Sequence, residues 1–143
     1  MKIDSIKNGI VIDHISAGKS MEIYNYLKLD SLGCPVAVLQ NVKSNKMGRK
    51  DIMKIDSDTI NINFDVLGYI DPDITVNIIK DGKIAEKKHL ELPREMVNVL
   101  FCSNPRCITS AEPELDHIFR LTDKKTRTYR CAYCESKSKN RQD

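Results

Sequence analysis

The stretch CSNPRC, residues 102–107, is separated by 23 residues from CAYC, residues 131–134. Two pairs of closely spaced cysteines bring four soft ligands, which is the number that tetrahedral Zn²⁺ takes in proteins. Because four thiolates leave no position for water, the expected ion is structural, one Zn²⁺ per chain, held by Cys102, Cys107, Cys131 and Cys134. Two disulfides or four unrelated thiols are the alternatives that the residues leave open.

The dipeptide Leu92-Pro93 marks a change in the sequence pattern. Strand-like and helix-like patterns precede it, whereas short apolar runs separated by the cysteine pairs follow it. A segment as small as the second one cannot bury enough surface to be stable without a staple. We therefore expect two domains, residues 1–93 and 94–143, the second being a small all-β zinc ribbon that its metal stabilises.

Strand patterns dominate the first domain. Asp81-Gly82 lies between two of them and is a strong hairpin signal, so the run 84–90 should pair with the strand before the turn. The other apolar or alternating stretches that predict strands are 10–15, 36–39, 51–56 and 74–80.

Two helices separate these strands. Ser16 is the expected cap of the first, with Ala17, Met21 and Tyr24 on one stripe, and the second contains Ile62 and must stop before Pro72. The order predicts an α+β fold, a ferredoxin-like βαββαβ antiparallel sheet with an extra edge strand and two helices on one face.

The composition is that of a soluble protein with a modest aliphatic core, since 41% of residues are hydrophobic and Trp is absent. Residues 1–8 lack the apolar region of a secretory signal, and no stretch approaches the length that spans a membrane. A cytoplasmic location is therefore expected, where thiols stay reduced and cysteine pairs favour metal binding. The fifth cysteine, Cys34, is expected to be a small core residue.

The net charge of +3 is concentrated in the cysteine-containing part. Residues 1–93 carry 13 Lys and Arg and 13 Asp and Glu, whereas residues 94–143 carry 10 against 7. Five of those cations surround the interleaved aromatic residues Phe119 and Tyr129: Arg120, Lys124, Lys125, Arg127 and Arg130. Such a segment is typical of nucleic-acid binding, so a zinc-ribbon nucleic-acid-binding protein is the alternative function.

Catalytic patterns are lacking in the sequence. Its only histidines are His14, His89 and His117, and they form no Ser/His/Asp arrangement, while the cysteine set leaves no open metal position. We therefore do not expect the chain to be an enzyme by itself.

Several motifs stand in one order over nearly the whole chain. They are Gly9-Ile-Val-Ile-Asp-His-Ile15, Met47-Gly-Arg-Lys-Asp51, Thr75-Val-Asn77, Leu92-Pro93 with Asn98-Val-Leu100, Cys-x4-Cys-Ile-x2-Ala-Glu-Pro at 102–113 and Cys-x-Tyr-Cys-Glu at 131–135. Together they resemble the regulatory chain of aspartate carbamoyltransferase, an enzyme of pyrimidine biosynthesis. The resemblance implies a non-catalytic subunit with an N-terminal nucleotide-sensing domain and a C-terminal zinc domain that holds the catalytic chain.

The resemblance also implies that the effectors are the nucleoside triphosphates CTP, UTP and ATP. Their pocket corresponds to Ile6, Val11, Asp13, His14, Lys54, Asn77, Gly82, Ile84, Lys87 and His89. Lys87 and His14 suit a triphosphate, Lys54 a ribose or pyrimidine carbonyl, and Asp13 a ribose hydroxyl. The residues alone instead favour solvated charges at Lys54 and Lys87 and a turn or helix start at Asp13-His14, and only the resemblance reverses that interpretation.

Three departures from the family pattern concern this pocket: Gly82 replaces an aromatic residue, His89 stands where the family has Arg, and the chain begins several residues later. They are expected to alter effector preference. At the zinc end, the resemblance places Asn104, Arg106 and Glu135 against the catalytic chain, although Arg106 and Glu135 could each be an ordinary exposed charge. It further implies regulatory-chain homodimers that join two catalytic trimers, giving six chains of each kind.

Overall fold

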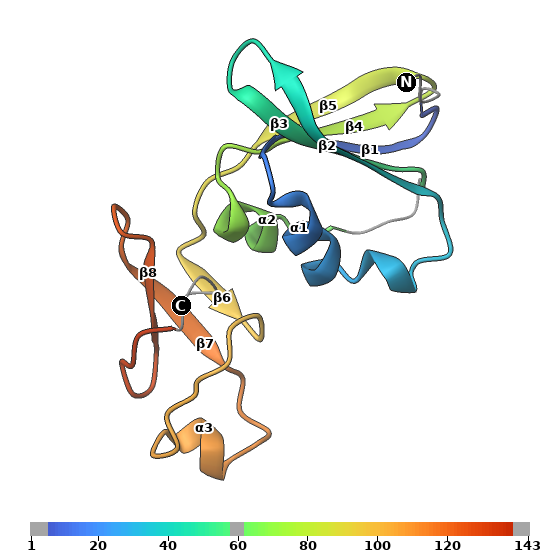
Figure 1. Cartoon of the computed structure of the whole chain (residues 1–143). Helices are drawn as coiled ribbons and strands as arrows, with labels where there is room; N and C mark the ends of the chain where they lie inside the picture. Colours follow the sequence, from blue (N-terminus) through green and yellow to red (C-terminus); the bar gives the residue numbers. More distant parts are fainter. Residues whose placement is uncertain (1–5, 58–61, 139–143) are drawn as a thin grey trace. The chain divides into compact units, whose positions relative to one another are not determined.

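The structure is a computed structural model that describes residues 6–57 and 62–138 (Figure 1). The chain divides into two compact units, Met1–Glu91 (unit 1) and Leu92–Asp143 (unit 2), and each is described by itself. Within the described ranges, the structure contains no helix with the length and apolar character that a membrane span requires.

Unit 1 is built on one five-stranded sheet with the order β2-β3-β1-β4-β5, in which all neighbours are antiparallel. Its strands are β1 Gly9–Ser16, β2 Val36–Ser44, β3 Gly48–Ile55, β4 Thr75–Lys80 and β5 Lys83–His89. The helices α1 Ser20–Tyr26 and α2 Phe64–Ile70 lie on the same face of the sheet, as Figure 1 shows, and a short 3-10 turn, η1 Leu29–Ser31, follows α1. The predicted α+β sheet with an added edge strand is confirmed.

Alternation along the strands divides the sheet into a core face and an outer face. Ile12, Met53 and Val76 point toward the helices and are fully buried. Their neighbours in sequence point the other way, so the face away from the helices carries the more polar residues. The strand register, rather than the sequence order, therefore decides which side chains meet on that outer face.

Helix α1 differs from its sequence-based prediction. Ser16 belongs to the end of β1 and does not cap the helix, which begins at Ser20 after Lys19 and has no side-chain cap of its own. Met21, expected on the buried stripe, is 45% exposed, whereas Ile23 is fully buried. The predicted buried stripe was wrong, because the residues of α1 that face the core are Ser20 and Ile23.

A buried carboxylate from another strand replaces the missing cap. Asp51 on β3 accepts hydrogen bonds from the backbone N–H groups of Gly18 (3.0 Å) and Ser20 (3.2 Å) through one oxygen, and from Asn41 (2.8 Å) through the other. Burial raises the pKa of Asp51, but the Ser20 hydroxyl and these backbone N–H groups outweigh burial and lower it. The fully buried Asp51 thus joins the start of α1 to the irregular middle of β2.

The other local predictions mostly hold. Helix α2 ends at Ile70 before Pro72 as predicted, but it begins at Phe64, so Ile62, which was expected within it, precedes the helix. Asn63, which the sequence analysis did not single out, caps α2 by accepting from the N–H groups of Asp65 and Val66. Asp81 (φ 53°) and Gly82 (φ 76°) both take the left-handed conformation that a tight two-residue hairpin requires, so the predicted β4–β5 hairpin is confirmed. Cys34 is partly exposed instead of buried in the core, because it lies in the connection between η1 and β2.

Unit 2 is organised around a three-stranded sheet with the order β6-β7-β8. The strands are β6 Glu95–Val97, β7 Ile118–Asp123 and β8 Thr128–Cys131, and a one-turn helix, α3 Ile108–Ala111, which the sequence did not signal, follows the first cysteine pair. Its core consists of Met96, Phe119 and Tyr129, each at most 1% exposed. Such a small core is consistent with a fold that needs a metal.

Candidate metal centre and nucleotide pocket

The four cysteines of unit 2 meet at one point. Their sulfur atoms all lie within 4.8 Å of one another, with 3.6 Å between the sulfurs of Cys102 and Cys134 and 3.7 Å between those of Cys107 and Cys131. Four sulfurs at the usual Zn–S distance of about 2.3 Å stand about 3.8 Å apart on a tetrahedron. All four are free thiols, so the disulfide alternative fails and the donor set fits a tetrahedral thiolate-bound metal.

Hydroxyl groups support two of the sulfurs. Thr109 Oγ1 donates to Cys107 Sγ at 3.1 Å and lowers the pKa of that thiol. Ser136 Oγ lies 3.2 Å from Cys134 Sγ and lowers the pKa of Cys134 to about 6. Burial instead raises the pKa of Cys102 to about 12, as expected for a sulfur surrounded by other thiols with no cation beside it. The hydroxyls act as outer partners that hold thiolate ligands in place.

The three residues expected to contact the catalytic chain differ in their surroundings. Asn104 is held within the first cysteine loop, since its side chain accepts from Arg106 N (3.0 Å) and donates to Ser136 Oγ (3.3 Å). The side chains of Arg106 and Glu135 are exposed, and Glu135 has a positive φ of 63°. Arg106 and Glu135 are therefore available to a partner, while Asn104 mainly joins the two cysteine loops.

Sequence reasoning missed three exposed apolar residues beside the metal cluster. Phe101, Ile108 and Tyr133 are 65%, 51% and 42% exposed, and each adjoins or lies between the cluster cysteines. Exposed apolar side chains on loops that a metal pins are common at protein interfaces. Their signal was present in the sequence as apolar residues directly next to ligand positions.

The two aromatic residues that favoured a nucleic-acid-binding function are buried. Phe119 is 1% exposed and Tyr129 is fully buried, where its hydroxyl donates to Pro93 O at 2.6 Å. Neither ring is available to stack on a base, which is how single-stranded nucleic acids are usually bound.

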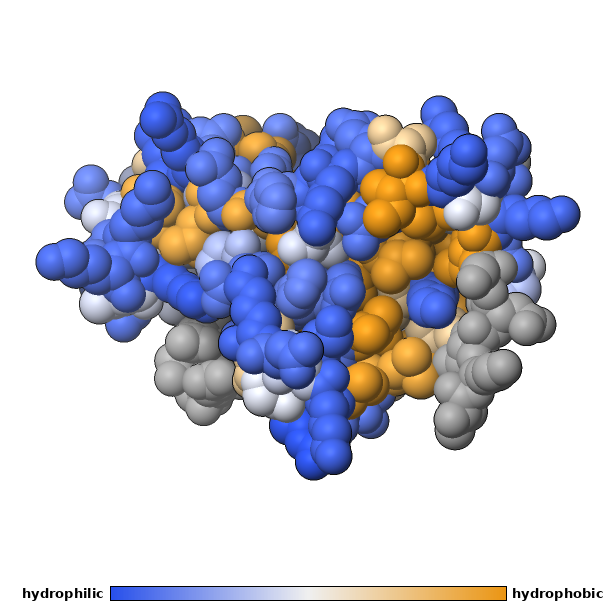
Figure 2. All heavy atoms as spheres, turned by 90° about the horizontal axis from the view of Figure 1, so that it is seen from above, coloured by the Kyte–Doolittle hydropathy of each residue, from blue (hydrophilic) through white to orange (hydrophobic). Residues whose placement is uncertain are grey.

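A pocket of about 250 Å³ opens on the outer face of unit 1. Its lining residues are Ile6, Val11, Lys54, Asn77, Ile79, Gly82 and Ile84. Six of the ten expected nucleotide-binding residues are among them, and Ile79 is an addition. Figure 2 looks onto the molecule from the sheet side and shows an apolar area flanked by hydrophilic side chains.

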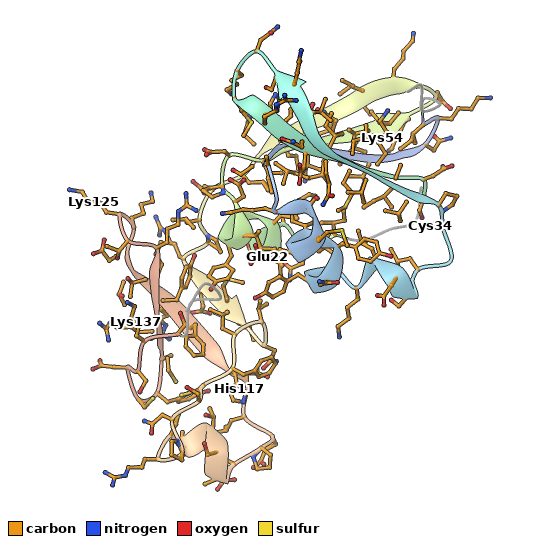
Figure 3. All side chains as sticks on the ribbon, viewed as in Figure 1. Glu22, Cys34, Lys54, His117, Lys125 and Lys137 are labelled. Carbon is orange, nitrogen blue, oxygen red and sulfur yellow. The ribbon has the colours of Figure 1, made fainter. Side chains whose placement is uncertain are left out.

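The strand register builds the polar part of this pocket. Val11 on β1 is paired with Lys54 on β3 and with Asn77 on β4, and Asn77 is in turn paired with Lys87 on β5. Four neighbouring strands thus present these residues in one row on one face, and Figure 3 shows Lys54 within the sheet. Lys87 does not line the pocket but stands one strand beyond Asn77.

Asn77 carries an unpaired buried acceptor. Its Oδ1 atom is buried without a hydrogen-bond partner, and among the described residues no other buried side-chain nitrogen or oxygen is in that state. An unpaired buried polar group costs about 1–3 kcal/mol, so native proteins rarely retain one without a function. A ligand hydroxyl or amino group in the pocket would supply the missing donor.

Charged residues continue the site along β1. Asp13 forms an ion pair with Lys50 (3.0 Å) and accepts from His14 N (2.6 Å); burial raises the pKa of Asp13, but these contacts outweigh burial and lower it. His14, whose φ is 57°, lies 3.2 Å from Thr75 Oγ1 through Nδ1. Thr75 is paired with Asp13 on one side and with His89 on the other. Asp13, His14 and His89 thus do not line the pocket. They lie past its far end, the end opposite the Asp81-Gly82 turn.

Two protein families match the chain. The family described as "Aspartate carbamoyltransferase regulatory chain, allosteric domain" matches residues 1–91, and the one described as "Aspartate carbamoyltransferase regulatory chain, metal binding domain" matches residues 94–142.

Curated relatives carry the same description over nearly their whole length. The aspartate carbamoyltransferase regulatory chain of Clostridium tetani is 53% identical over 135 residues, which cover 94% of this chain and 94% of that protein. That of Clostridium acetobutylicum is 50% identical over 135 residues, 94% of this chain and 92% of that protein. That of Bifidobacterium longum is 43% identical over 139 residues, 97% of this chain and 99% of that protein.

Proposed function

This chain belongs to the family of aspartate carbamoyltransferase regulatory chains, and on that premise we propose that it binds nucleoside triphosphates in unit 1 to regulate catalytic chains allosterically. As a regulatory chain it is the non-catalytic subunit, and its partner is the catalytic chain. CTP, UTP and ATP are the effectors, acting on pyrimidine biosynthesis. Regulatory chains pair as homodimers through unit 1 and join two catalytic trimers, giving six chains of each kind.

The unpaired Oδ1 of Asn77 is the observation that carries the nucleotide proposal. It lies in a pocket whose end at the Asp81-Gly82 turn is apolar, formed by Ile6, Ile79 and Ile84. A base fits that end, and the ribose then meets Asn77 and Lys54, which are paired with Val11 from opposite sides. Asn77 Oδ1 accepts from the ligand while the Lys54 ammonium donates to it.

The phosphates then extend away from the turn. Lys87, one strand beyond Asn77, supplies a fixed positive charge, and His14 stands farther along β1. Lys50 neutralises Asp13, which reduces the repulsion that this carboxylate would exert on a triphosphate. Because Gly82 carries no side chain, this residue leaves room at the base end of the pocket. That opening accommodates purine as well as pyrimidine bases.

The metal of unit 2 is zinc, bound by the four cysteines. Tetrahedral thiolate sites suit Zn²⁺, and the sulfur spacings of 3.6 and 3.7 Å agree with the tetrahedral edge given above. When bound, zinc supplies no catalysis here; it fixes the two cysteine loops. The chain's own Arg106, Glu135 and the exposed apolar residues beside them then contact the catalytic chain with little loss of conformational entropy.

Calorimetric titration of the full chain with CTP, UTP and ATP tests the nucleotide proposal. Lys54→Ala and Lys87→Ala should each weaken binding by roughly 1.5–3 kcal/mol, since each removes a charge-assisted hydrogen bond. Lys46→Ala, an exposed lysine of the β2–β3 turn, is the matched control and should leave affinity unchanged. Wild-type affinity in both the Lys54→Ala and the Lys87→Ala variants would mean that the nucleotide site is assigned to the wrong face.

Carbamoyl transfer by the reconstituted complex tests the regulatory part. Addition of the chain to catalytic trimers should make their rate respond to nucleotides, mainly as a several-fold change in the aspartate concentration for half-maximal rate. Couplings between separate sites typically amount to roughly 1–3 kcal/mol. Lys87→Ala should leave the complex intact by sedimentation but weaken the response of its rate to nucleotides. Dissociation of the complex in this variant would contradict the proposal that unit 1 binds nucleotide while unit 2 contacts the catalytic chain.

A further inference from the structure

Three cations lie side by side across the sheet of unit 2. Arg120 on β7 is paired with Arg130 on β8, and Arg130 is in turn bridged to Lys137. We call Arg120, Arg130 and Lys137 the cationic row. Like charges at directly opposed positions of an antiparallel sheet repel each other and destabilise it. Their placement is therefore unfavourable for the isolated unit.

Compensation of the row by neighbouring acids is small. Glu95, paired with Arg120 on the other side, forms an ion pair with it at 3.2 Å, but both side chains are more than 45% exposed. Arg130 Nη1 donates to the backbone carbonyl of Glu135 at 3.1 Å, which adds no negative side-chain charge. An exposed ion pair of this kind contributes at most about 1 kcal/mol. The row therefore presents excess positive charge to solvent.

The β7–β8 turn extends this positive surface. Lys124, Lys125 and Arg127 are exposed at the turn, and Asp123 uses one carboxylate oxygen to accept from the N–H groups of Lys125 and Thr126. Figure 3 shows Lys125 at the hairpin tip and His117 at the other end of unit 2, beside α3. The acids Glu112, Glu114 and Asp116 lie in the loop at that other end. Charge is thus segregated along unit 2.

We propose that the cationic row is a docking surface for a carboxylate-rich patch of the catalytic chain, separate from the contact made by the metal-pinned loops. Neighbouring strands are about 4.8 Å apart, so the row spans about 10 Å, a width that a few partner carboxylates match. Val97 lies two residues after Glu95 on the same side of β6. It is 45% exposed and adds an apolar contact beside the cationic row. Since the aromatic rings of this sheet are buried on the opposite side, the face suits a protein better than a single-stranded nucleic acid. The proposal rests on the partnership with the catalytic chain stated above.

The experiment compares two double variants with equal loss of charge. Arg120→Gln/Lys137→Gln removes two row cations but keeps Arg130 and its bond to Glu135, and Lys43→Gln/Lys46→Gln removes two exposed cations of unit 1. Association of each zinc-loaded full chain with the catalytic trimer is followed by surface plasmon resonance at low and high salt. Zinc content and CTP affinity are measured in parallel.

The row variant should associate about 2- to 30-fold more slowly at low salt, with the difference shrinking at high salt, while the unit 1 variant behaves as wild type. Normal zinc content and CTP affinity separate this result from a failure of the proposed function. If the row variant loses zinc, Lys137→Gln alone repeats the test.

Wild-type association by the row variant, or equal slowing in both variants, overturns the proposal. A single-stranded oligonucleotide serves as a second probe. Should the row variant lose binding to that oligonucleotide yet associate normally with the trimer, the surface serves nucleic acid and the proposal is also overturned.

Discussion

Replacement of Asn77 by leucine should move two measurable quantities in opposite directions. Leucine has nearly the shape of asparagine but no polar atoms, so Asn77→Leu removes the buried, unpaired Oδ1 while keeping the side-chain volume. The nucleotide-free chain should become more stable because an unpaired buried acceptor is lost. The same change should weaken nucleotide binding because the ligand donor then faces an apolar group.

The expected changes in stability and in CTP affinity both follow from the unpaired Oδ1 of Asn77. An unpaired buried acceptor costs about 1–3 kcal/mol, so the free energy of unfolding of the nucleotide-free chain should rise by up to that amount. Binding relieves the same cost in the wild type, and the variant loses this relief together with the hydrogen bond. CTP affinity should therefore fall by about 1–3 kcal/mol, roughly a 5- to 150-fold rise in Kd.

Urea unfolding followed by circular dichroism measures the first quantity, and calorimetric titration with CTP measures the second. Asn25→Leu, at an exposed position of α1, is the control and should change neither by more than about 0.5 kcal/mol. A variant that is less stable without nucleotide, or that binds CTP as tightly as wild type, would refute the role assigned to this atom.

Two further predictions concern the buried carboxylate and the metal. Asp51→Asn should destabilise the chain by about 2–4 kcal/mol in urea unfolding, because the amide nitrogen cannot accept from backbone N–H groups, whereas the exposed Asp56→Asn should be neutral. The folded-state pKa of Asp51 is below its ordinary value of 3.8, so the stability that Asp51 contributes is present above pH 3.8 and is lost as the pH falls through the lower folded-state pKa. If the wild-type chain and the Asp51→Asn chain had the same acid unfolding curve, this prediction would be contradicted. Cys134→Ser should lose the zinc equivalent measured by metal analysis and release unregulated catalytic trimers, while CTP still binds unit 1; full zinc retention would show that the ligand set is wrong.

Local chemistry made several features predictable from the sequence. Within each cysteine pair the two ligands are separated by a loop of only four or two residues, and Asp81-Gly82 encodes a left-handed turn by itself. Alternating apolar residues determined which side of each strand is buried, and the position of Pro72 set the end of α2. In each case the interacting groups are close in sequence, so few arrangements compete.

The tertiary structure alone decided the features that join distant residues. Asp51 replaces the cap of a helix that begins 31 residues earlier in the chain, which no local pattern encodes. Strand register places Lys54 and Asn77 on either side of Val11 and leaves Asn77 Oδ1 unpaired, and it also aligns the cations of unit 2. The burial of Tyr129, which the sequence presented as a stacking residue, follows from the same cause. A hydrogen bond or a buried contact between remote residues depends on how the whole chain pairs and packs, and a one-residue slip in register would have moved every one of these side chains to the other face.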